Sequence, residues 1–403
     1  MKIVVAGAGI GGLATALALA RTGHSVDVIE RAPALGDVGA GIQISPNAVK
    51  VLRALGLEQR LLATASRPQF LELRLGRSGR HIFAIPMGLA SVKRYGAPYL
   101  HLHRADLLGL LHDAAVEAGV QIRLGAAIAA YAGQGQQVRV DLASGEPVVA
   151  DLLVGADGMR SIVRRQMLGE EMLGEDMPRF TGSVAWRLLA PASAAPDLPH
   201  GAIVWAGPGR HAVTYRIRGD TLINFVGVIE ESPSAPAPPE GWNEVGDPAA
   251  LKQAFAGWAD PLPAIIAAGG ACHRWPLFDR DPLPRWVDGR VVLLGDACHP
   301  LPPFQAQGAA MAIEDGFVLA RCLKEGEGET EAALLRYRLL RGPRTMRVLE
   351  SARANMSVFH RSSPLSQAMT SGPMMLADRL LPSVVRSRQD WIYGYDVTGD
   401  MLG

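Results

Sequence analysis

The sequence predicts an α/β fold in which a mostly parallel sheet is interrupted by an antiparallel sheet and followed by a helical segment. Three observations predict this fold. Short β-branched runs that suit strands buried on both faces occur near the beginning of the chain and again at Val291–Leu294. Between about Phe180 and Glu230 the pattern changes to strands separated by Gly, Pro and Asp turns. From about Glu331 the chain is mainly helical in pattern and is punctuated by prolines.

The predicted helices of the parallel part end next to glycines. Gly23, Gly56 and Gly119 mark three such ends, because glycine after the last turn is a common stop signal. The parallel part is predicted to contain strands 2–6, 24–29, 121–123, 138–142, 151–154 and 291–294, and helices 13–21, 46–55, 106–118 and 308–323. The predicted antiparallel strands are 182–189, 202–206, 211–217 and 221–229, and a proline-rich loop is expected at 232–241.

The composition is that of an ordinary globular protein. The 403 residues are 48% hydrophobic and 20% charged, which suits a buried core and not a disordered chain. Forty basic and 39 acidic residues give a net charge of +1, so we expect no nucleic-acid or membrane partner. Glycines interrupt the first apolar stretch, which argues against a signal peptide. Three widely spaced cysteines form no CxxC pair, which favours a cytoplasmic location and no metal site.

A glycine motif lies between the first predicted strand and helix. Gly7 permits the tight turn, Gly9 lets the backbone approach a pyrophosphate, and Gly12 allows close packing of helix on strand. The helix N-terminus offers free N–H groups to the phosphates. Glu30 ends the next strand and is placed to accept hydrogen bonds from ribose hydroxyls, and an acid there disfavours a 2′-phosphate. The motif predicts a bound dinucleotide, either FAD or NAD.

Two aspartates follow buried strands elsewhere in the chain. Asp157 follows the strand that ends at Val154, and Asp296 follows the strand that ends at Leu294. Ligands of open α/β sheets bind at the carboxyl ends of the strands, so both aspartates are candidate ligand contacts, although each one alone could simply cap a turn. The helix that begins at Gly308 is predicted to direct its N-terminus at the same ligand, where it would stabilise negative charge.

Together with Arg104, these segments resemble the single-component FAD-dependent aromatic hydroxylases, in the branch that contains salicylate hydroxylase, 3-hydroxybenzoate 6-hydroxylase and 6-hydroxynicotinate 3-monooxygenase. The resemblance covers nearly the whole chain. The matching segments are 7–12, 39–43 with Asn47, 157–158, 295–300, 306–308 and 390–396. The chain has one GxGxxG motif, so it lacks the separate nicotinamide domain of other flavoprotein families.

The resemblance implies a Rossmann-like FAD-binding domain (1–70, 100–179 and 275–345), an inserted antiparallel substrate domain (71–99 and 180–274) and a helical C-terminal segment (346–403). It implies FAD as cofactor, NADH or NADPH and O₂ as co-substrates, and a small phenolic aromatic acid as substrate, in a monomer or homodimer. The expected cofactor-binding residues are Gly7, Gly9, Gly12, Glu30, Arg31, Gln43, Arg104, Asp157, Asp296, Gly308 and Ala309. NADH is expected over NADPH, since no Arg or Lys cluster points to a 2′-phosphate.

One strand carries the expected catalytic pair. Along His211–Ile217 a two-residue period places His211, Val213 and Tyr215 on one face. This face is either a substrate pocket or an ordinary core-facing surface, and the resemblance favours the pocket, with His211 and Tyr215 as catalytic residues. In the family, O₂ adds to reduced FAD to give a C4a-hydroperoxide, which a phenolate attacks. A histidine suits removal of the phenol proton, either directly or through a tyrosine.

The loop before Gly308 is expected to exclude water from the reaction. Pro303 and Phe304 are expected in the substrate pocket, and Phe304 stands where the hydroxynicotinate branch has a histidine, which favours a benzenoid substrate. His299 is either a proton-relay neighbour or a structural residue, and Cys298 is expected to be buried filler. The alternatives are hydroxylation of a pyridine carboxylate such as 6-hydroxynicotinate, a flavoprotein oxidase or epoxidase, and a dinucleotide-binding regulator without turnover.

Overall fold

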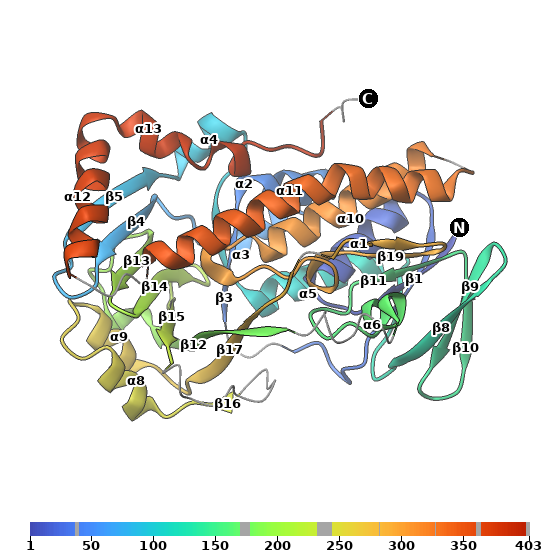
Figure 1. The fold of residues 1–403 in the computed structure, drawn as a ribbon, viewed down its shortest axis with the longest axis horizontal. Helices are drawn as coiled ribbons and strands as arrows, with labels where there is room; N and C mark the ends of the chain where they lie inside the picture. The colour runs from blue at the N-terminus through green and yellow to red at the C-terminus, as the bar shows by residue number, and fades with distance from the viewer. Residues whose placement is uncertain are drawn as a thin grey trace.

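The computed structural model describes residues 1–36, 40–169, 178–231, 244–281, 283–326, 328–359 and 364–399. The described chain is a mixed α/β structure with two main sheets, which lie toward opposite ends of the view in Figure 1. The predicted fold class is confirmed. The proline-rich loop expected at 232–241 falls outside the described residues.

The first main sheet has six strands in the order β18–β19–β11–β1–β2–β7. Their bounds are β1 Lys2–Ala6, β2 Ser25–Ile29, β7 Gln121–Arg123, β11 Leu152–Gly155, β18 Val287–Asp288 and β19 Val291–Leu293. All neighbours pair in parallel except the edge strand β18. The continuous β-branched pattern of β1 follows from this position, since Ile3, Val4 and Val5 are completely buried.

Helices and a small second sheet bury these strands. Helix α1 (Ile10–Arg21) packs on β1 and β2, with α5 (Arg104–Glu117) and α10 (Gly308–Glu325) beside it (Figure 1). Helix α2 (Pro46–Ala54) packs against α10, and α3 (Glu58–Thr64) against α5. The small sheet consists of β8 (Ile128–Gln134), β9 (Gln137–Leu142) and β10 (Pro147–Ala150), and α6 (Ile162–Leu168) packs against β8. The predicted strand 138–142 therefore belongs to a separate sheet, whose two other strands the sequence analysis did not identify.

The second main sheet has eight strands in the order β16–β17–β12–β15–β14–β13–β4–β5. Their bounds are β4 Phe70–Leu75, β5 His81–Pro86, β12 Arg179–Pro191, β13 Ala202–Gly207, β14 Arg210–Ile217, β15 Leu222–Glu230, β16 Glu244–Val245 and β17 His273–Asp279. Its pairs are antiparallel except β13–β4. One face buries a core with α8 (Pro248–Ala254) and α9 (Leu262–Ala268). Because β4 and β5 join the strands after residue 178 in one sheet, we propose that residues 71–99 and 180–274 form one substrate domain.

A two-stranded ribbon lies against this sheet. Strand β3 (Gly41–Ile44) pairs with β6 (Leu100–His103), and β6 contacts β14. Helix α4 (Leu89–Tyr95) precedes β6. The ribbon could not be predicted from the sequence, because two four-residue strands give too short a pattern. Short 3₁₀ turns occur at Ala192–Ala194, Gly295–Ala297 and Pro303–Gln305.

The C-terminal part is helical, as predicted. Helix α11 (Thr330–Phe359) runs along α10, and α12 (Pro364–Leu380), α13 (Pro382–Ser387) and α14 (Asp390–Tyr393) follow it toward β4 and β5 (Figure 1). No helix among the described residues combines the length and hydrophobicity needed to cross a bilayer. Within the same residues, no three His, Cys, Asp or Glu side chains gather in a metal-binding arrangement.

Candidate functional site

A cavity of about 550 Å³ lies between the two main sheets. A second cavity of about 220 Å³ lies beside it and shares part of its wall, including Gly9, Arg31 and Asp157. From the nucleotide side the larger cavity is lined by Gly9, Arg31, Gln43, Arg104, Asp157, Asp296, Gly308 and Ala309. From the eight-stranded sheet it is lined by Arg187, His211, Val213, Tyr215, Val226 and Val228. Residues from five separated parts of the chain therefore meet in one place.

The three glycines of the N-terminal motif have different surroundings. Gly7 has φ +97°, and a Cβ there would lie 2.6 Å from the Ala156 carbonyl oxygen. At Gly12 a Cβ would lie 2.0 Å from the Gly7 carbonyl oxygen, so this glycine permits helix α1 to approach the turn. At Gly9 a Cβ would meet no protein atom within 4 Å, and Gly9 borders both cavities. Gly9 also precedes α1 without a side-chain cap, so free backbone N–H groups of the first turn are available to an anion.

Glu30 lines the smaller cavity. Its two carboxylate oxygens accept hydrogen bonds from the backbone N–H groups of Ala8 and Ala32, both at 2.8 Å. These bonds hold the carboxylate at the end of β2, while each oxygen keeps a free lone pair for a ligand hydroxyl. Arg31 follows it and lines both cavities.

Asp157 has one satisfied and one unsatisfied carboxylate oxygen. Oδ2 accepts hydrogen bonds from the backbone N–H groups of Ile162 (2.8 Å) and Val163 (3.3 Å). Asp157 therefore caps a turn, which was one of the two roles considered for it from the sequence. Oδ1 is buried and has no hydrogen-bond partner in the described chain. Burial raises the pKa of Asp157, against the lowering effect of the hydrogen bonds it accepts. A buried oxygen without a donor, on the wall of a cavity, is a place where a ligand hydroxyl fits.

Asp296 and the beginning of α10 form the adjoining wall. The Asp296 side chain is exposed to the cavity, but surrounding protein atoms desolvate it and raise its pKa, against the lowering effect of His299 and Arg104. Gly308 and Ala309 begin α10 beside it, with no side-chain cap on the helix N-terminus. The open backbone at Gly9, the unsatisfied Asp157 oxygen and the uncapped N-terminus of α10 together fit a long ligand with a phosphate group, hydroxyls and a ring that accepts negative charge. FAD has these features.

The eight-stranded sheet contributes the opposite wall through strand β14. His211, Val213 and Tyr215 all line the cavity, so the two-residue period places them together as expected. Pairing across the sheet sets His211 in one row with Val228, Val213 with Val226, and Tyr215 with Asn224. Both rings are buried, with 3% of each residue exposed.

Tyr215 lies against the β3–β6 ribbon. A Cβ on Gly41 would lie 2.7 Å from the Tyr215 Oη, so only glycine leaves space for the phenol there. The His101 ring lies 4.5 Å from the Tyr215 ring, between centroids. Burial lowers the pKa of His101 to about 3 and raises the pKa of Tyr215, so both groups are neutral near pH 7. Gln43, which also lines the cavity, accepts a 2.7 Å hydrogen bond from the Tyr99 hydroxyl.

The loop before α10 brings Pro303 to the cavity wall. Phe304 does not line the cavity among the described residues. It packs behind His211, with the two ring centroids 5.7 Å apart, in a cluster with Ala185 and Val228. Phe304 was expected to line the substrate pocket, but it instead packs against the His211 ring from outside the cavity.

His299 is directed away from the cavity. Its Nε2 lies 2.6 Å from Asp315 Oδ2, and its ring lies 5.3 Å from the Trp286 ring. The structural role therefore accounts for His299 in this structure. Cys298 is completely buried, as expected for a filler residue.

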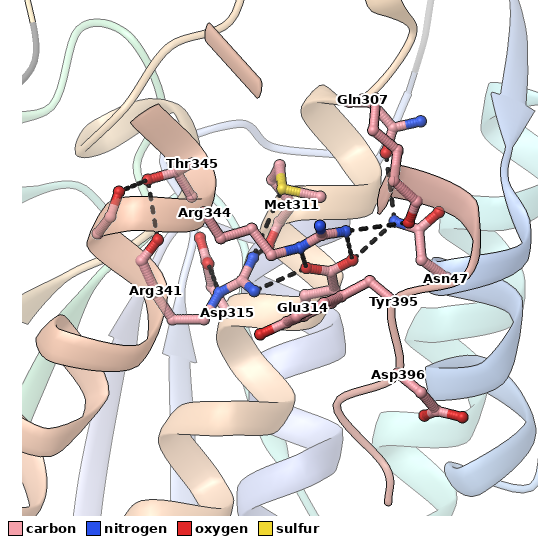
Figure 2. Close-up of polar contacts among 12 residues, drawn as sticks. Asn47, Gln307, Met311, Glu314, Asp315, Arg341, Arg344, Thr345, Tyr395 and Asp396 are labelled. Atoms are coloured by element: carbon pink, nitrogen blue, oxygen red, sulfur yellow. Dashed lines mark hydrogen bonds and ion pairs between the residues drawn. The ribbon is translucent and has the colours of Figure 1, made fainter. Parts of the chain in front are cut away.

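A cluster of buried charges holds α10 in position (Figure 2). Glu314 and Asp315 of α10 pair with Arg341 and Arg344 of α11 at 2.7–2.8 Å. Burial alone would raise the pKa of Glu314, but Arg341 and Arg344 outweigh burial and the pKa is lowered. Asn47 joins the cluster by donating a 2.7 Å hydrogen bond to Glu314. The two acids and the two arginines balance in charge and pair with one another, and such pairing is needed to offset the cost of burying charged groups.

Sequence reasoning missed two groups of residues at this site. The charges of α10 and α11 lie in segments predicted to be helical, and nothing in the sequence pattern shows that these side chains are buried. Arg187 belongs to the predicted strand 182–189. The alternation of side chains along this strand could have shown that Arg187 faces the opposite side from Trp186 and Leu188.

Comparisons with known proteins agree with this geometry. The profile of a family described as "FAD binding domain" matches residues 1–352. A 3-amino-4-hydroxybenzoate 2-monooxygenase from Streptomyces cremeus is 39% identical over 409 residues, covering 98% of this chain and 95% of the relative. A 6-hydroxynicotinate 3-monooxygenase from Pseudomonas fluorescens is 39% identical over 353 residues, covering 86% and 89%. The structure of a salicylate hydroxylase substrate complex is 25% identical in sequence and superimposes with a TM-score of 0.82, covering 98% of this chain and 96% of that chain.

Proposed function

The chain belongs to the FAD-binding family of aromatic hydroxylases, and on that premise we propose that it is an NAD(P)H-consuming monooxygenase that hydroxylates a phenolic aromatic acid. The observation that carries the proposal is the shared cavity. One wall has the features that fit FAD, and the facing wall carries His211 and Tyr215 on a single strand. A substrate bound between them would face both the cofactor and a group able to take a proton.

The nucleotide side would hold FAD through backbone and carboxylate groups. We assign the pyrophosphate to the turn at Gly9, the adenosine ribose to Glu30, and the ribityl hydroxyls to Asp157 and Asp296. The α10 N-terminus at Gly308 would stabilise negative charge on the reduced ring. When bound and reduced by NAD(P)H, FAD would activate O₂, which would supply one oxygen atom to the substrate and release the other as water. NADH would be the reductant, because no Arg or Lys cluster in the sequence points to a site for the 2′-phosphate of NADPH.

The sheet side would prepare the substrate. We assign His211 as the base that takes the proton of the substrate hydroxyl, because a phenolate is the stronger nucleophile. Tyr215 keeps its own proton near pH 7, so it is assigned to hydrogen bonding with the substrate and not to carrying a negative charge. Pro303 and Val213 would exclude water from the reaction. In this assignment Phe304 acts through His211, by holding the imidazole ring in place.

A substrate panel tests the proposed function. The purified protein is expected to be yellow and to oxidise NADH faster when salicylate or 3-hydroxybenzoate is present, with a product that gains one oxygen atom. Hydroxylation of 6-hydroxynicotinate in preference to every hydroxybenzoate would replace the benzenoid assignment with the pyridine alternative. A colourless protein that binds NAD alone would refute the proposal, and a tenfold preference for NADPH would refute the choice of NADH.

A further inference from the structure

Arg187 is a charged residue on the sheet side of the cavity that neither the motif nor the proposed chemistry uses. It lies in the middle of β12, whose side chains alternate between two environments. Val184, Trp186 and Leu188 belong to the core under α8 and α9. Arg187 points to the opposite face, where it lines the cavity with the residues of β14. A half-buried arginine in that position needs an explanation, because arginine is rarely buried without a role.

The register of the sheet places Arg187 relative to the proposed catalytic residues. Arg187 pairs with Val226, and Val226 pairs with Val213, so the three residues form one row across β12, β15 and β14. This row lies between the row of His211 and the row of Tyr215. With a strand spacing of about 4.8 Å, the Arg187 and Val213 Cα atoms are roughly 10 Å apart.

The sheet therefore presents an apolar floor with polar groups on two opposite sides. Val213 and Val226 form the floor, His211 and Tyr215 lie along one edge, and Arg187 lies across the floor from them. A flat ring lying on the two valines would direct one substituent at β14 and another at Arg187.

A neighbouring tryptophan orients the guanidinium. The Arg187 Cζ lies 4.7 Å from the centroid of the Trp275 ring, which comes from the adjacent strand β17. Stacking on an aromatic face fixes the plane of the guanidinium without using its N–H donors. The positive charge is close enough to Tyr215 to lower the pKa of that phenol, against the larger raising effect of burial.

The charges of the cavity are distributed unevenly. The two acids on its wall, Asp157 and Asp296, belong to the nucleotide side. Among the described residues that the eight-stranded sheet contributes to the cavity, Arg187 is the one with a permanent charge. A substrate lying on the sheet therefore meets a cation and no carboxylate.

We propose that Arg187 is the anchor for the carboxylate of the substrate and makes the site selective for aromatic acids over neutral phenols. The inference rests on the proposed function, which it deepens by naming the residue that recognises the acid group. The guanidinium fork matches a carboxylate geometrically, and its position across the floor orients the ring with its hydroxyl toward His211 and Tyr215.

Binding measurements on acids and their amides test this assignment. Dissociation constants of 3-hydroxybenzoate, 3-hydroxybenzamide, salicylate and salicylamide are measured by calorimetry on the FAD-loaded protein. The wild type is expected to bind each acid more tightly than its amide. Arg187→Gln is expected to reduce that preference by about 10- to 100-fold, the range expected for a hydrogen bond to a charged group, with little change for the amides. Arg187→Lys should retain part of the preference, because it keeps the charge but loses the fork.

Arg274→Gln is the matched control. Arg274 also stacks on a tryptophan, Trp186, at 5.3 Å, but it pairs with Glu231 and lies outside the cavity wall. The control should keep the acid preference of the wild type. If Arg187→Gln still hydroxylates the acids and keeps the wild-type preference for acids over amides, the proposed role of Arg187 is wrong while the proposed function stands. A wild type that neither binds nor hydroxylates any of the four compounds overturns the role of Arg187 together with the proposed substrate class.

Discussion

The nucleotide half of the cavity is lined largely by turns and helix ends, whereas the sheet half is lined by side chains that project from strands. Gly9 and Gly308 offer backbone to a ligand, and what matters there is the absence of a side chain. On the sheet, His211, Tyr215 and Arg187 each offer a particular functional group. The difference shows how one scaffold serves two tasks. On the proposed function, the cofactor would be held largely by backbone groups, and the substrate would be chosen by individual side chains.

The largest expected effect concerns the nucleotide half. Gly9→Val would fill open space and not collide with protein, so the chain should fold but exclude the pyrophosphate. We expect a largely colourless protein with normal far-UV circular dichroism. Gly109→Val is the control, because a Cβ on Gly109, within α5, also meets no atom within 4 Å but lies away from both cavities. Stoichiometric FAD in purified Gly9→Val would contradict the assignment of the turn.

Damage to the sheet half should leave the cofactor in place. His211→Ala and Tyr215→Phe are expected to keep FAD and its reduction by NADH, and to lose about 10²- to 10⁴-fold in hydroxylation, the range for loss of general acid–base catalysis. The missing turnover should appear as hydrogen peroxide. Raising the pH toward ionisation of the phenol should partly restore hydroxylation in His211→Ala, because solvent then removes the proton. Near-normal rates and coupling in both variants would show that the pair is structural.

The contact between the two halves should give a smaller effect. A Cβ on Gly41 would lie 2.7 Å from the Tyr215 Oη and 2.7 Å from the Asn224 Cγ, so Gly41→Ala must displace these side chains. Misplacement by about 1 Å costs up to roughly 10²-fold in rate, so we expect a 10- to 100-fold loss of hydroxylation with FAD retained. Combining Gly41→Ala with Tyr215→Phe should add little to the single Tyr215→Phe effect. A fully additive loss would mean that Gly41 acts through another residue.

The smallest effect is a pH dependence in the charge cluster behind the nucleotide half. Burial raises the pKa of Asp315, but His299 and Arg341 outweigh it and lower the pKa to about 2. Because the unfolded chain takes up this proton first, the stability from Asp315 is complete above about pH 4 and falls as the pH drops toward 2. The shift corresponds to about 2 kcal/mol of unfolding free energy.

Urea unfolding measured across this range gives the test. Asp315→Asn should lose less stability between about pH 4 and pH 2 than the wild type, since it has no proton to take up there. Asp113→Asn is the control, because the Asp113 side chain is 60% exposed. Parallel pH curves for wild type and Asp315→Asn would remove this residue from the acid dependence.

The same division explains how much could be predicted from the sequence. The strand, glycine turn and helix at the N-terminus are contiguous, so local pattern was sufficient for β1, α1 and the place of Glu30. The facing wall depends on which strands become neighbours. Alternation along β14 placed His211 with Tyr215, but only the pairing of β12, β15 and β14 brings Arg187 opposite them. Phe304 was predicted to line the pocket, and two roles were left open for His299. Both lie in a loop, and the spacing of residues along the sequence does not show where a loop directs its side chains. The partner of His299 is Asp315, which lies on the next helix.

The strand order of the six-stranded sheet also has a consequence for biosynthesis. Its central strands β1 and β11 pair Ile3 with Leu152, and β11 then pairs Leu153 with Val291. A growing chain therefore carries β11 with an unpaired edge while more than a hundred further residues are made, including six of the eight strands of the second main sheet. Such edges invite aggregation, and slow nonlocal pairing prolongs the exposure. Yield of the native protein should accordingly depend on translation rate and chaperone supply more than the modest length of the chain suggests.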